Sequence, residues 1–376
     1  MMIYLDHAAT TPLDKDALAA MMPYLTYEFG NSSSQHGYGQ RAANAVIAAR
    51  DIISGVMGVP SADLYFTSGG TESGNTALKG VCSANAAKGR HLVISSIEHH
   101  ALIESALDLK KQGYEVTLVP PSQSGIVSPE AVGAAIRPDT VFVSVMSANN
   151  EVGTIQPVKD IYAACREKGV FFYCDCVQTA GVLAFEQFPA DGVGLSSHKF
   201  YGPKGFGALY MRSGTPFSRL ISGGKQERGL RGGTTFVAGA VGCAEALKKA
   251  ENNRVENNAK VAKLRDAFIG LVESGIEGAY LNGDRANRLP SNANFSFDKC
   301  DGEQIAFSLD LAGIAVSTGS ACSSGAVTPS HVLLAMGLGE ERAKSAVRFT
   351  FGKENTEDEV YQTFEKLKEI VKRIRG

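Results

Sequence analysis

Short apolar runs alternate with helix-like stretches along the middle of the chain, and this alternation limits the folds that the sequence can adopt. The runs contain four or five residues and begin at Leu64, Leu92, Val116, Val141 and Val170. Buried strands that alternate with helices form a mostly parallel sheet with helices on both faces. We therefore expect an α/β fold with such a sheet at its centre.

Polar residues follow the apolar runs at the points where the predicted strands end. In open parallel sheets, ligands bind beyond the carboxyl ends of the strands, and these ends meet at one edge. One polar residue after a strand is expected in any loop, but polar residues that follow several consecutive strands indicate a single pocket. The residues are Thr71, His99, Asn150, Asp175, Gln178 and Lys199.

Lys199 lies in the segment Ser196-Ser197-His198-Lys199, between two strand-like runs. Near a buried site its amine would lose hydration, which lowers the pKa of a lysine and makes the amine a nucleophile able to form a Schiff base. The alternative is an ordinary solvated surface charge. Ser196 and His198 stand beside the lysine and could bind an anionic group such as a phosphate.

A glycine turn offers a second place for a phosphate. Ser68-Gly69-Gly70-Thr71 follows the first apolar run and leads into a helix-like stretch. Free backbone N–H groups and the positive end of the helix dipole make such a helix start an anion site. Adjacent glycines also occur in common turns, so this motif counts only together with the other strand ends.

Asp175 and His99 each have a structural and a chemical interpretation. Asp175 could be a helix N-cap or a loop carboxylate, or it could keep the nitrogen of a pyridine ring protonated and so make the ring an electron sink. His99 could be a hydrogen-bonded core histidine, or it could stack on such a ring and shuttle protons. The cofactor-type Lys199, one strand further along the chain, favours the chemical interpretation of Asp175.

The second half of the chain has a different organisation. A segment rich in asparagine and charge, Glu251 to Lys260, indicates a domain boundary or an exposed connecting helix. The rest reads as an α+β unit, and a capping box at Thr356 and Glu359 predicts the start of its last helix. The expected domains are a large one, residues 14–254, and a small one that carries the cysteine loop, residues 1–13 with 255–376.

Two residues of the second half stand out chemically. Arg348 lies inside an apolar strand-like run, and a buried arginine needs an anionic partner, either a structural carboxylate or the carboxylate of a substrate. Cys322 lies in the small-residue loop Thr318 to Gly325, without large apolar neighbours. Because structural cysteines are usually buried among apolar side chains, this context favours a reactive nucleophile.

The cysteines also indicate the compartment. The seven cysteines are scattered and odd in number, which favours a reducing cytoplasm with free thiols. Cys174 and Cys176 flank Asp175 and would share one face of an extended segment. C-x-C could bind a metal, but no second pair or histidine with ligand spacing completes a site, so we expect ordinary packing and no metal.

Composition argues against other classes of partner. Of the 376 residues, 44% are hydrophobic and 20% are charged, and the net charge is −2, so neither nucleic acid nor an anionic membrane is indicated as a partner. No apolar run reaches the length that spans a membrane. The first residues lack the basic region and apolar core of a signal peptide.

Taken together, the motifs resemble those of the NifS/IscS-type cysteine desulfurases, pyridoxal-phosphate enzymes of the aminotransferase class V group. The resemblance runs nearly from end to end, and the combination is specific although no single motif is. It implies fold type I of the pyridoxal-phosphate-dependent transferases, with a mostly parallel sheet in a large domain and a small α+β domain. The motifs are Tyr4-Leu5-Asp6 with Ala9-Thr10-Thr11-Pro12, Phe66 to Ser73, Asn149 to Gly153, Asp175 with Gln178, Ser196 to Lys199 with Tyr201 to Gly205, and Ser317 to Ser323.

The resemblance implies a role for each candidate residue toward pyridoxal 5′-phosphate. Lys199 binds the cofactor covalently and later moves protons, Asp175 pairs with the pyridine nitrogen, and Gln178 pairs with the phenolic oxygen. His99 stacks on the ring. The phosphate is held by Gly70, Thr71, Ser196 and His198, and by Thr234 from across a dimer interface.

The resemblance also implies a reaction. Asn150 and Arg348 take the carboxylate of free L-cysteine, and the Cys322 thiolate attacks its sulfur. L-Cysteine becomes L-alanine, and the sulfur stays on Cys322 as a persulfide until an iron–sulfur scaffold or another acceptor protein receives it. The expected assembly is a cytoplasmic homodimer.

Three alternatives remain open from the sequence. A selenocysteine lyase would share the fold together with Lys199 and Asp175. An ordinary aminotransferase would use the same ring residues and would not need Cys322. From another class, a catalytically silent sulfur-relay scaffold would need none of the ring residues, and the intact set of Lys199, Asp175 and His99 argues against it.

Overall fold

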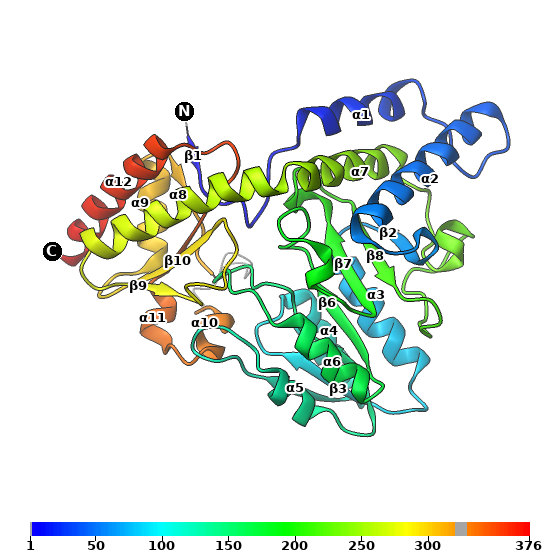
Figure 1. The fold of residues 1–376 in the computed structure, drawn as a ribbon, viewed down its shortest axis with the longest axis horizontal. Coiled ribbons are helices and arrows are strands. Elements are labelled where there is room, and N and C mark those ends of the chain that lie inside the picture. The colour runs from blue at the N-terminus through cyan, green and yellow to red at the C-terminus, as the bar shows by residue number, and fades with distance from the viewer. Residues whose placement is uncertain (1, 320–328) are drawn as a thin grey trace.

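The structure of the chain, a computed structural model, describes residues 2–319 and 329–376. Within these residues the elements form two groups, a large one around a seven-stranded sheet and a small one around a three-stranded sheet (Figure 1). Cys322 lies outside the described residues, so the structure does not place the predicted nucleophile.

The large sheet is mostly parallel, as expected. Its strand order is β2-β8-β7-β6-β5-β3-β4. Strand β8 pairs antiparallel with both β2 and β7, whereas the pairs from β7 to β4 are parallel. The strands are β2 (Leu64–Thr67), β3 (His91–Ser95), β4 (Glu115–Val119), β5 (Thr140–Ser144), β6 (Phe171–Asp175), β7 (Gly192–Ser196) and β8 (Gly207–Met211).

Alternate residues of these strands enter cores on opposite faces of the sheet. On β3, Leu92 and Ile94 join the cluster under α3 and α4, whereas Val93 joins the cluster that α2 and α7 cover. This two-sided burial explains why the strands read as continuous apolar runs. The helices of this group are α1 (Lys15–Thr26), α2 (Gly37–Met57), α3 (Gly70–Ala84), α4 (His100–Lys111), α5 (Pro129–Ala135), α6 (Val158–Glu167) and α7 (Val237–Asn252).

The small group has its own apolar core. Its antiparallel sheet has the order β12-β10-β9, and the core beneath it combines Phe268, Phe295 and Phe349 with residues of the last helix. The elements are α8 (Arg254–Gly275), β9 (Ala279–Asn282), β10 (Asn292–Phe297), α9 (Gly302–Leu311), β11 (Ile314–Ala315), β12 (Ala346–Thr350) and α12 (Glu357–Arg375). The short helices α10 (His331–Ala335) and α11 (Glu340–Lys344) precede β12, and their buried side chains join a core cluster of the large group.

The N-terminal arm joins the small group although it lies at the other end of the chain. Strand β1 (Ile3–Tyr4) pairs in parallel with β11, and the side chains of Ile3 and Leu5 belong to the small core. The predicted limits at residues 14 and 254 stay a prediction.

The predicted connecting segment from Glu251 to Lys260 is almost entirely helical. Helix α7 ends at Asn252 and α8 begins two residues later, so one long helical path leads from the large group to the small one (Figure 1). Among the described residues, no helix combines the length and the apolar character needed to cross a membrane.

The predicted capping box is present at the start of α12. The Thr356 hydroxyl accepts a hydrogen bond from the backbone N–H of Glu359 at 3.3 Å, and a carboxylate oxygen of Glu359 accepts one from the N–H of Thr356 at 3.1 Å. These bonds satisfy two backbone donors that the helix itself cannot pair.

Replacing Thr356 by alanine is therefore expected to destabilise the first turn of α12 by about 1 kcal/mol, whereas Thr356→Ser should keep most of the cap. Amide hydrogen exchange in α12 would measure this difference. Equal protection of the helix in the alanine variant and the parent would contradict the assigned cap.

Candidate active site

A cavity of about 500 Å³ lies beyond the carboxyl ends of β3, β5, β6 and β7. Ten of the twelve residues that the sequence proposes for the site line it, and they come from segments throughout the chain. They are Gly70, Thr71, His99, Asn150, Asp175, Gln178, Ser196, His198, Lys199 and Arg348.

Asp175 is the last residue of β6, and its side chain is buried at the floor of this cavity. Burial raises the pKa of its carboxyl to about 6, although a hydrogen bond from the backbone N–H of Val177 (2.9 Å) and the charge of Lys199 act in the opposite direction. A carboxylate in such a place gains from a cationic N–H partner, and a pyridinium nitrogen is one.

A second buried carboxyl, which the sequence analysis did not select, lies close to Asp175. Glu98 is fully buried, and burial together with the charge of Asp175 raises its pKa well above the usual range. Burial and the charge of Asp175 thus both favour the protonated form of Glu98. The sequence signal that could have identified Glu98 is its position directly before His99 and after an apolar strand.

Lys199 ends a short 3-10 turn, Ser197–Lys199, that follows β7. Its Nζ donates hydrogen bonds to the backbone carbonyls of Ala8 at 2.6 Å and Ala9 at 2.8 Å. Its side chain is half-buried and lines the cavity with Asp175. The N-terminal arm thus holds the amine at the site.

His99 is the N-cap of α4, and its Nδ1 accepts a hydrogen bond from the backbone N–H of Ala101 at 3.1 Å. Burial, followed by the charge of Lys199, lowers its pKa to about 4, so the ring is neutral at pH 7. With Nδ1 accepting, the proton of the neutral ring lies on Nε2. The side chain is thus a neutral aromatic ring with one N–H donor at the cavity wall.

The start of α3 forms an open recess of about 440 Å³ next to the cavity. Gly69 has φ of 148°, which favours glycine, and a Cβ on Gly70 would lie 2.6 Å from Cγ2 of Val177. The backbone N–H groups of the first helical turn and the hydroxyl of Ser196 suit a phosphate. Burial lowers the pKa of His198 to about 4, so His198 can contribute hydrogen bonding but not charge.

Arg348 has the anionic partner that its buried position in β12 requires. Its Nη2 lies 2.8 Å from Oδ1 of Asp6, and its Nη1 donates to the backbone carbonyl of Asn150 at 3.0 Å. The Nε of Arg348 is buried without a hydrogen-bond partner among the described residues. The structural carboxylate therefore exists, and the guanidinium also lines the cavity beside Asn150.

The two remaining predicted residues are Thr234 and Cys322. Thr234 is exposed and lies outside the cavity, whereas Cys322 falls outside the described residues. Cys174 and Cys176 are fully buried with their sulfurs 3.7 Å apart, and burial raises the pKa of the Cys174 thiol well above its usual range. No cluster of three or more metal-ligand side chains occurs in the part of the chain that the structure describes.

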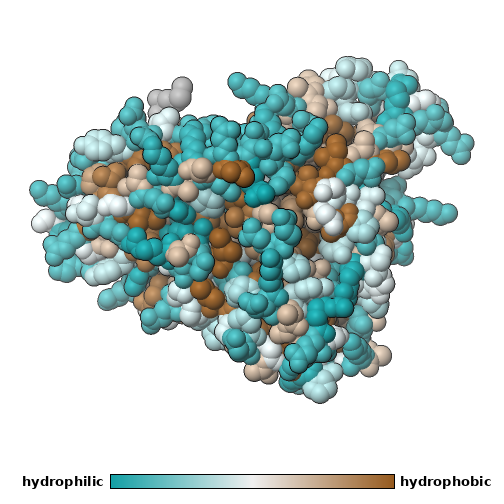
Figure 2. Space-filling model, in the orientation of Figure 1, coloured by the Kyte–Doolittle hydropathy of each residue, from teal (hydrophilic) through white to brown (hydrophobic). Residues whose placement is uncertain are grey.

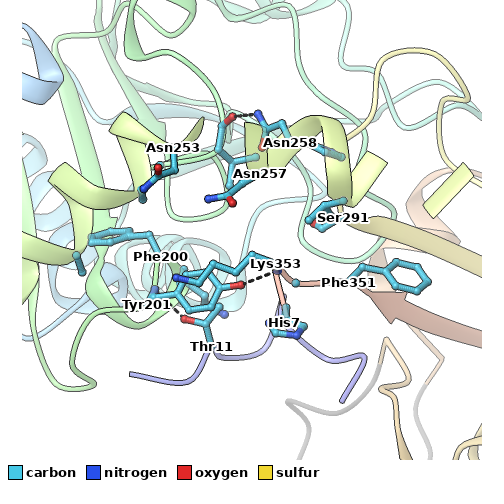
Figure 3. Close-up of a pocket in the computed structure, with 18 of the residues that line it drawn as sticks. His7, Thr11, Phe200, Tyr201, Asn253, Asn257, Asn258, Ser291, Phe351 and Lys353 are labelled. Carbon is cyan, nitrogen blue, oxygen red and sulfur yellow. Dashed lines mark hydrogen bonds between the residues drawn. The ribbon is translucent and has the colours of Figure 1, made fainter. Parts of the chain in front are cut away.

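A second cavity, of about 210 Å³, also has Lys199 in its lining, and Figure 3 shows other residues that line it. It is lined by Phe200 from the large core, Phe351 from the small core, and Asn257 and Ser291 from the segments between them. Lys199 lines both cavities, but Asp175 and His99 line only the first. The first cavity is therefore the candidate for catalysis.

The donor set of the first cavity fits pyridoxal 5′-phosphate. Lys199 would supply an amine for the aldehyde, Asp175 a buried carboxylate for the ring nitrogen, and the glycine-initiated helix backbone donors for the phosphate. Together with the mostly parallel sheet and the small α+β unit, the site defines the fold type I class of pyridoxal-phosphate-dependent enzymes.

Comparison with known proteins narrows this class. Residues 3–363 match the family described as aminotransferase class-V. A protein named cysteine desulfurase IscS from Dictyoglomus turgidum is 44% identical over 99% of this chain and 95% of its own length, and one from Methanosarcina thermophila is 43% identical over 100% and 93%. The chain belongs to the aminotransferase class V family, within its group of IscS-type, pyridoxal-phosphate-dependent cysteine desulfurases.

Solved structures agree with this assignment. A structure described as a NifS-like protein has a TM-score of 0.93 and 37% sequence identity, and the match covers 99% of this chain and 100% of that one. A structure described as SspA in complex with cysteine has a TM-score of 0.83 and 33% identity, and covers 94% of this chain and 100% of its own.

The raised pKa of Asp175 predicts how stability depends on pH in the cofactor-free protein. Between the ordinary value of 3.8 and about 6, the folded protein binds more protons than the unfolded chain, so the stability contributed by this group falls as pH rises. Asp175→Asn should therefore raise the free energy of unfolding at pH 7, by at most about 3 kcal/mol.

Urea denaturation of parent and variant at several pH values would test this expectation. The difference should shrink as the pH falls toward 4, because the carboxyl is then protonated in both states. A difference that stayed constant from pH 4 to pH 7 would show that Asp175 does not titrate as its burial indicates.

Proposed function

We propose that this chain is a cysteine desulfurase, which converts L-cysteine to L-alanine and transfers the sulfur to the thiol of Cys322. The main support is one cavity that holds an amine, a buried carboxylate and a guanidinium, from Lys199, Asp175 and Arg348. The names of the relatives support the choice of substrate. The reaction balances as L-cysteine plus the Cys322 thiol giving L-alanine plus the Cys322 persulfide.

The residues of the cavity have distinct roles in this proposal. Bound pyridoxal 5′-phosphate supplies an electron sink that acidifies the substrate α-carbon and weakens its Cβ–S bond. Lys199 anchors the cofactor and moves the proton at the α-carbon, and Asp175 keeps the ring nitrogen protonated. The neutral ring of His99 covers the cofactor face, and Gln178 pairs with the phenolic oxygen.

Substrate binding and sulfur transfer use a different set of residues. Arg348 and Asn150 take the substrate carboxylate, with Arg348 held in place by Asp6. The thiolate of Cys322 attacks the substrate sulfur, and the electron pair of the Cβ–S bond stays with the carbon fragment that becomes alanine. The persulfide then passes its outer sulfur to an acceptor, either an iron–sulfur scaffold or another protein or molecule that is thiolated.

Two substitutions test this division of roles. Cys322→Ala should abolish sulfide release from L-cysteine in the presence of a reductant, but should keep the visible absorbance of the lysine-bound cofactor. Lys199→Ala should lose both. Cys300→Ala, at a half-exposed cysteine of the same unit, is the control and should keep both.

Unchanged sulfide release by Cys322→Ala would contradict the desulfurase mechanism. If that variant lost activity on L-cysteine but kept it on selenocysteine, the chain would act as a selenocysteine lyase. Failure of the parent chain to bind pyridoxal phosphate would contradict the site itself.

We further propose that the chain forms a homodimer in the cytoplasm, with Thr234 completing the phosphate site of the partner. Large apolar side chains are exposed on α1, on the segment after it and on the segment that carries Thr234. In Figure 1, α1 lies at the end of the molecule away from the three-stranded sheet, and Figure 2 shows apolar residues among hydrophilic ones on that part of the surface. Exposed apolar side chains that lie together are typical of an interface. The cytoplasmic assignment is supported by the six described cysteines, all of which are free thiols.

Light scattering should therefore give a mass of twice 39.7 kDa for the purified chain. Placing charges at two exposed positions, Leu25→Glu and Phe29→Glu, should shift the mass toward that of one chain. Leu311→Glu, at an apolar position on α9 that is at least as exposed as either, is the control and should leave the mass unchanged. A parent chain that is monomeric at micromolar concentration would refute the dimer.

A further inference from the structure

A carboxylate lines the recess that we assign to the cofactor phosphate. Glu72 is in the first turn of α3, directly after Thr71, and its side chain is only 9% exposed. It shares the recess with Gly70 and Ser196. A negative charge at the place where a phosphate dianion binds raises the electrostatic cost of binding, unless another group neutralises it.

Arg231 and one backbone donor provide this neutralisation. The Nε of Arg231 lies 2.9 Å from Oε1 of Glu72, its Nη2 lies 3.2 Å from Oε2, and the N–H of Ser68 donates to Oε2 at 2.8 Å. Burial alone would raise the pKa of Glu72, but these hydrogen bonds and the charge of Arg231 outweigh it and lower the pKa below the usual value. Glu72 is therefore ionised at neutral pH and paired in a two-pronged contact.

The segment that carries Arg231 is also fixed to the large sheet at a second point. The carboxylate of Glu227 is buried, lies 2.7 and 2.9 Å from two nitrogens of Arg50, and accepts a hydrogen bond from the backbone N–H of Phe66 at 2.8 Å. The backbone φ angles of Glu227 and Arg228 are 44° and 58°, a conformation that residues other than glycine rarely adopt. The surrounding contacts maintain this conformation, so the backbone that leads to Arg231 is tightly specified.

We propose that Arg231 is a positioning and charge-balancing residue of the phosphate site, acting through Glu72. The pair leaves the recess without a net repulsive charge, so the recess accepts a dianion. It also ties the start of α3 to the segment that leads, three residues later, to Thr234. This inference rests on the proposed placement of the cofactor phosphate at the start of α3.

A purely structural tie between Glu72 and Arg231 is the competing explanation, and a double substitution separates the two. Arg231→Gln leaves Glu72 unpaired beside the phosphate and should weaken the binding of pyridoxal phosphate by roughly tenfold, as expected for one uncompensated charge near a dianion. The Glu72→Gln variant should bind pyridoxal phosphate no more weakly than the parent does. The double variant removes both charges, and its affinity for pyridoxal phosphate should recover to within about threefold of that of the parent.

The readout is the dissociation constant of the cofactor for each full-length variant, followed by the absorbance of the lysine-bound form. Pyridoxal, which lacks the phosphate, is the matched ligand, and Arg231→Gln should leave its binding unchanged. Lys225→Gln removes the same charge from an exposed position of the same segment and should affect neither ligand.

Two results would overturn the inference. One is a double variant that binds pyridoxal phosphate as weakly as Arg231→Gln, because a lost structural tie is not repaired by removing its other half. The other is an equal loss of affinity for pyridoxal. A parent chain that binds neither ligand would instead refute the proposed function, so the two failures are distinguishable.

Discussion

Four neighbouring strands that run in the same direction and end at the same edge are the constraint on which the rest of this structure depends. Because β3, β5, β6 and β7 are buried on both faces, their interiors exclude polar side chains, and the chain carries its chemistry in the residues that end or follow each strand. Asp175 ends β6, and Lys199 lies three residues after β7. Because parallel strands end at the same edge of the sheet, their pairing alone brings these groups into one cavity.

The same burial that assembles the site also sets its charges. Asp175 and Glu98 are both buried, and burial raises the pKa of each carboxyl, because a lone carboxylate is costly where there is little water. Burial lowers the pKa of His99 and His198, so both imidazole rings stay neutral. These charges suit the proposed cofactor, which has a positive ring nitrogen and a separate anionic group.

The features that could be predicted from the sequence are those that depend on local position. The strand ends, the glycine turn before α3 and the cap of α12 are each specified by a few adjacent residues, and the structure has them where they were expected. The pairings between distant residues could not be predicted, because nothing local encodes them. Asp6 pairs with Arg348 across 342 positions, and Ala8 of the N-terminal arm accepts a hydrogen bond from Lys199 across 191. The carboxylate partner of Arg348 and the backbone partner of the Lys199 amine were therefore identified only from the structure.

The cavity behind Lys199 has a mechanical consequence. The large and the small group each have a close-packed interior that resists compression, so neither can change shape without breaking contacts. The cavity that Phe200 and Phe351 line lies where these two groups meet. A small rotation of one body against the other would therefore be taken up there, next to the amine, and the geometry around Lys199 would change while both cores stayed intact.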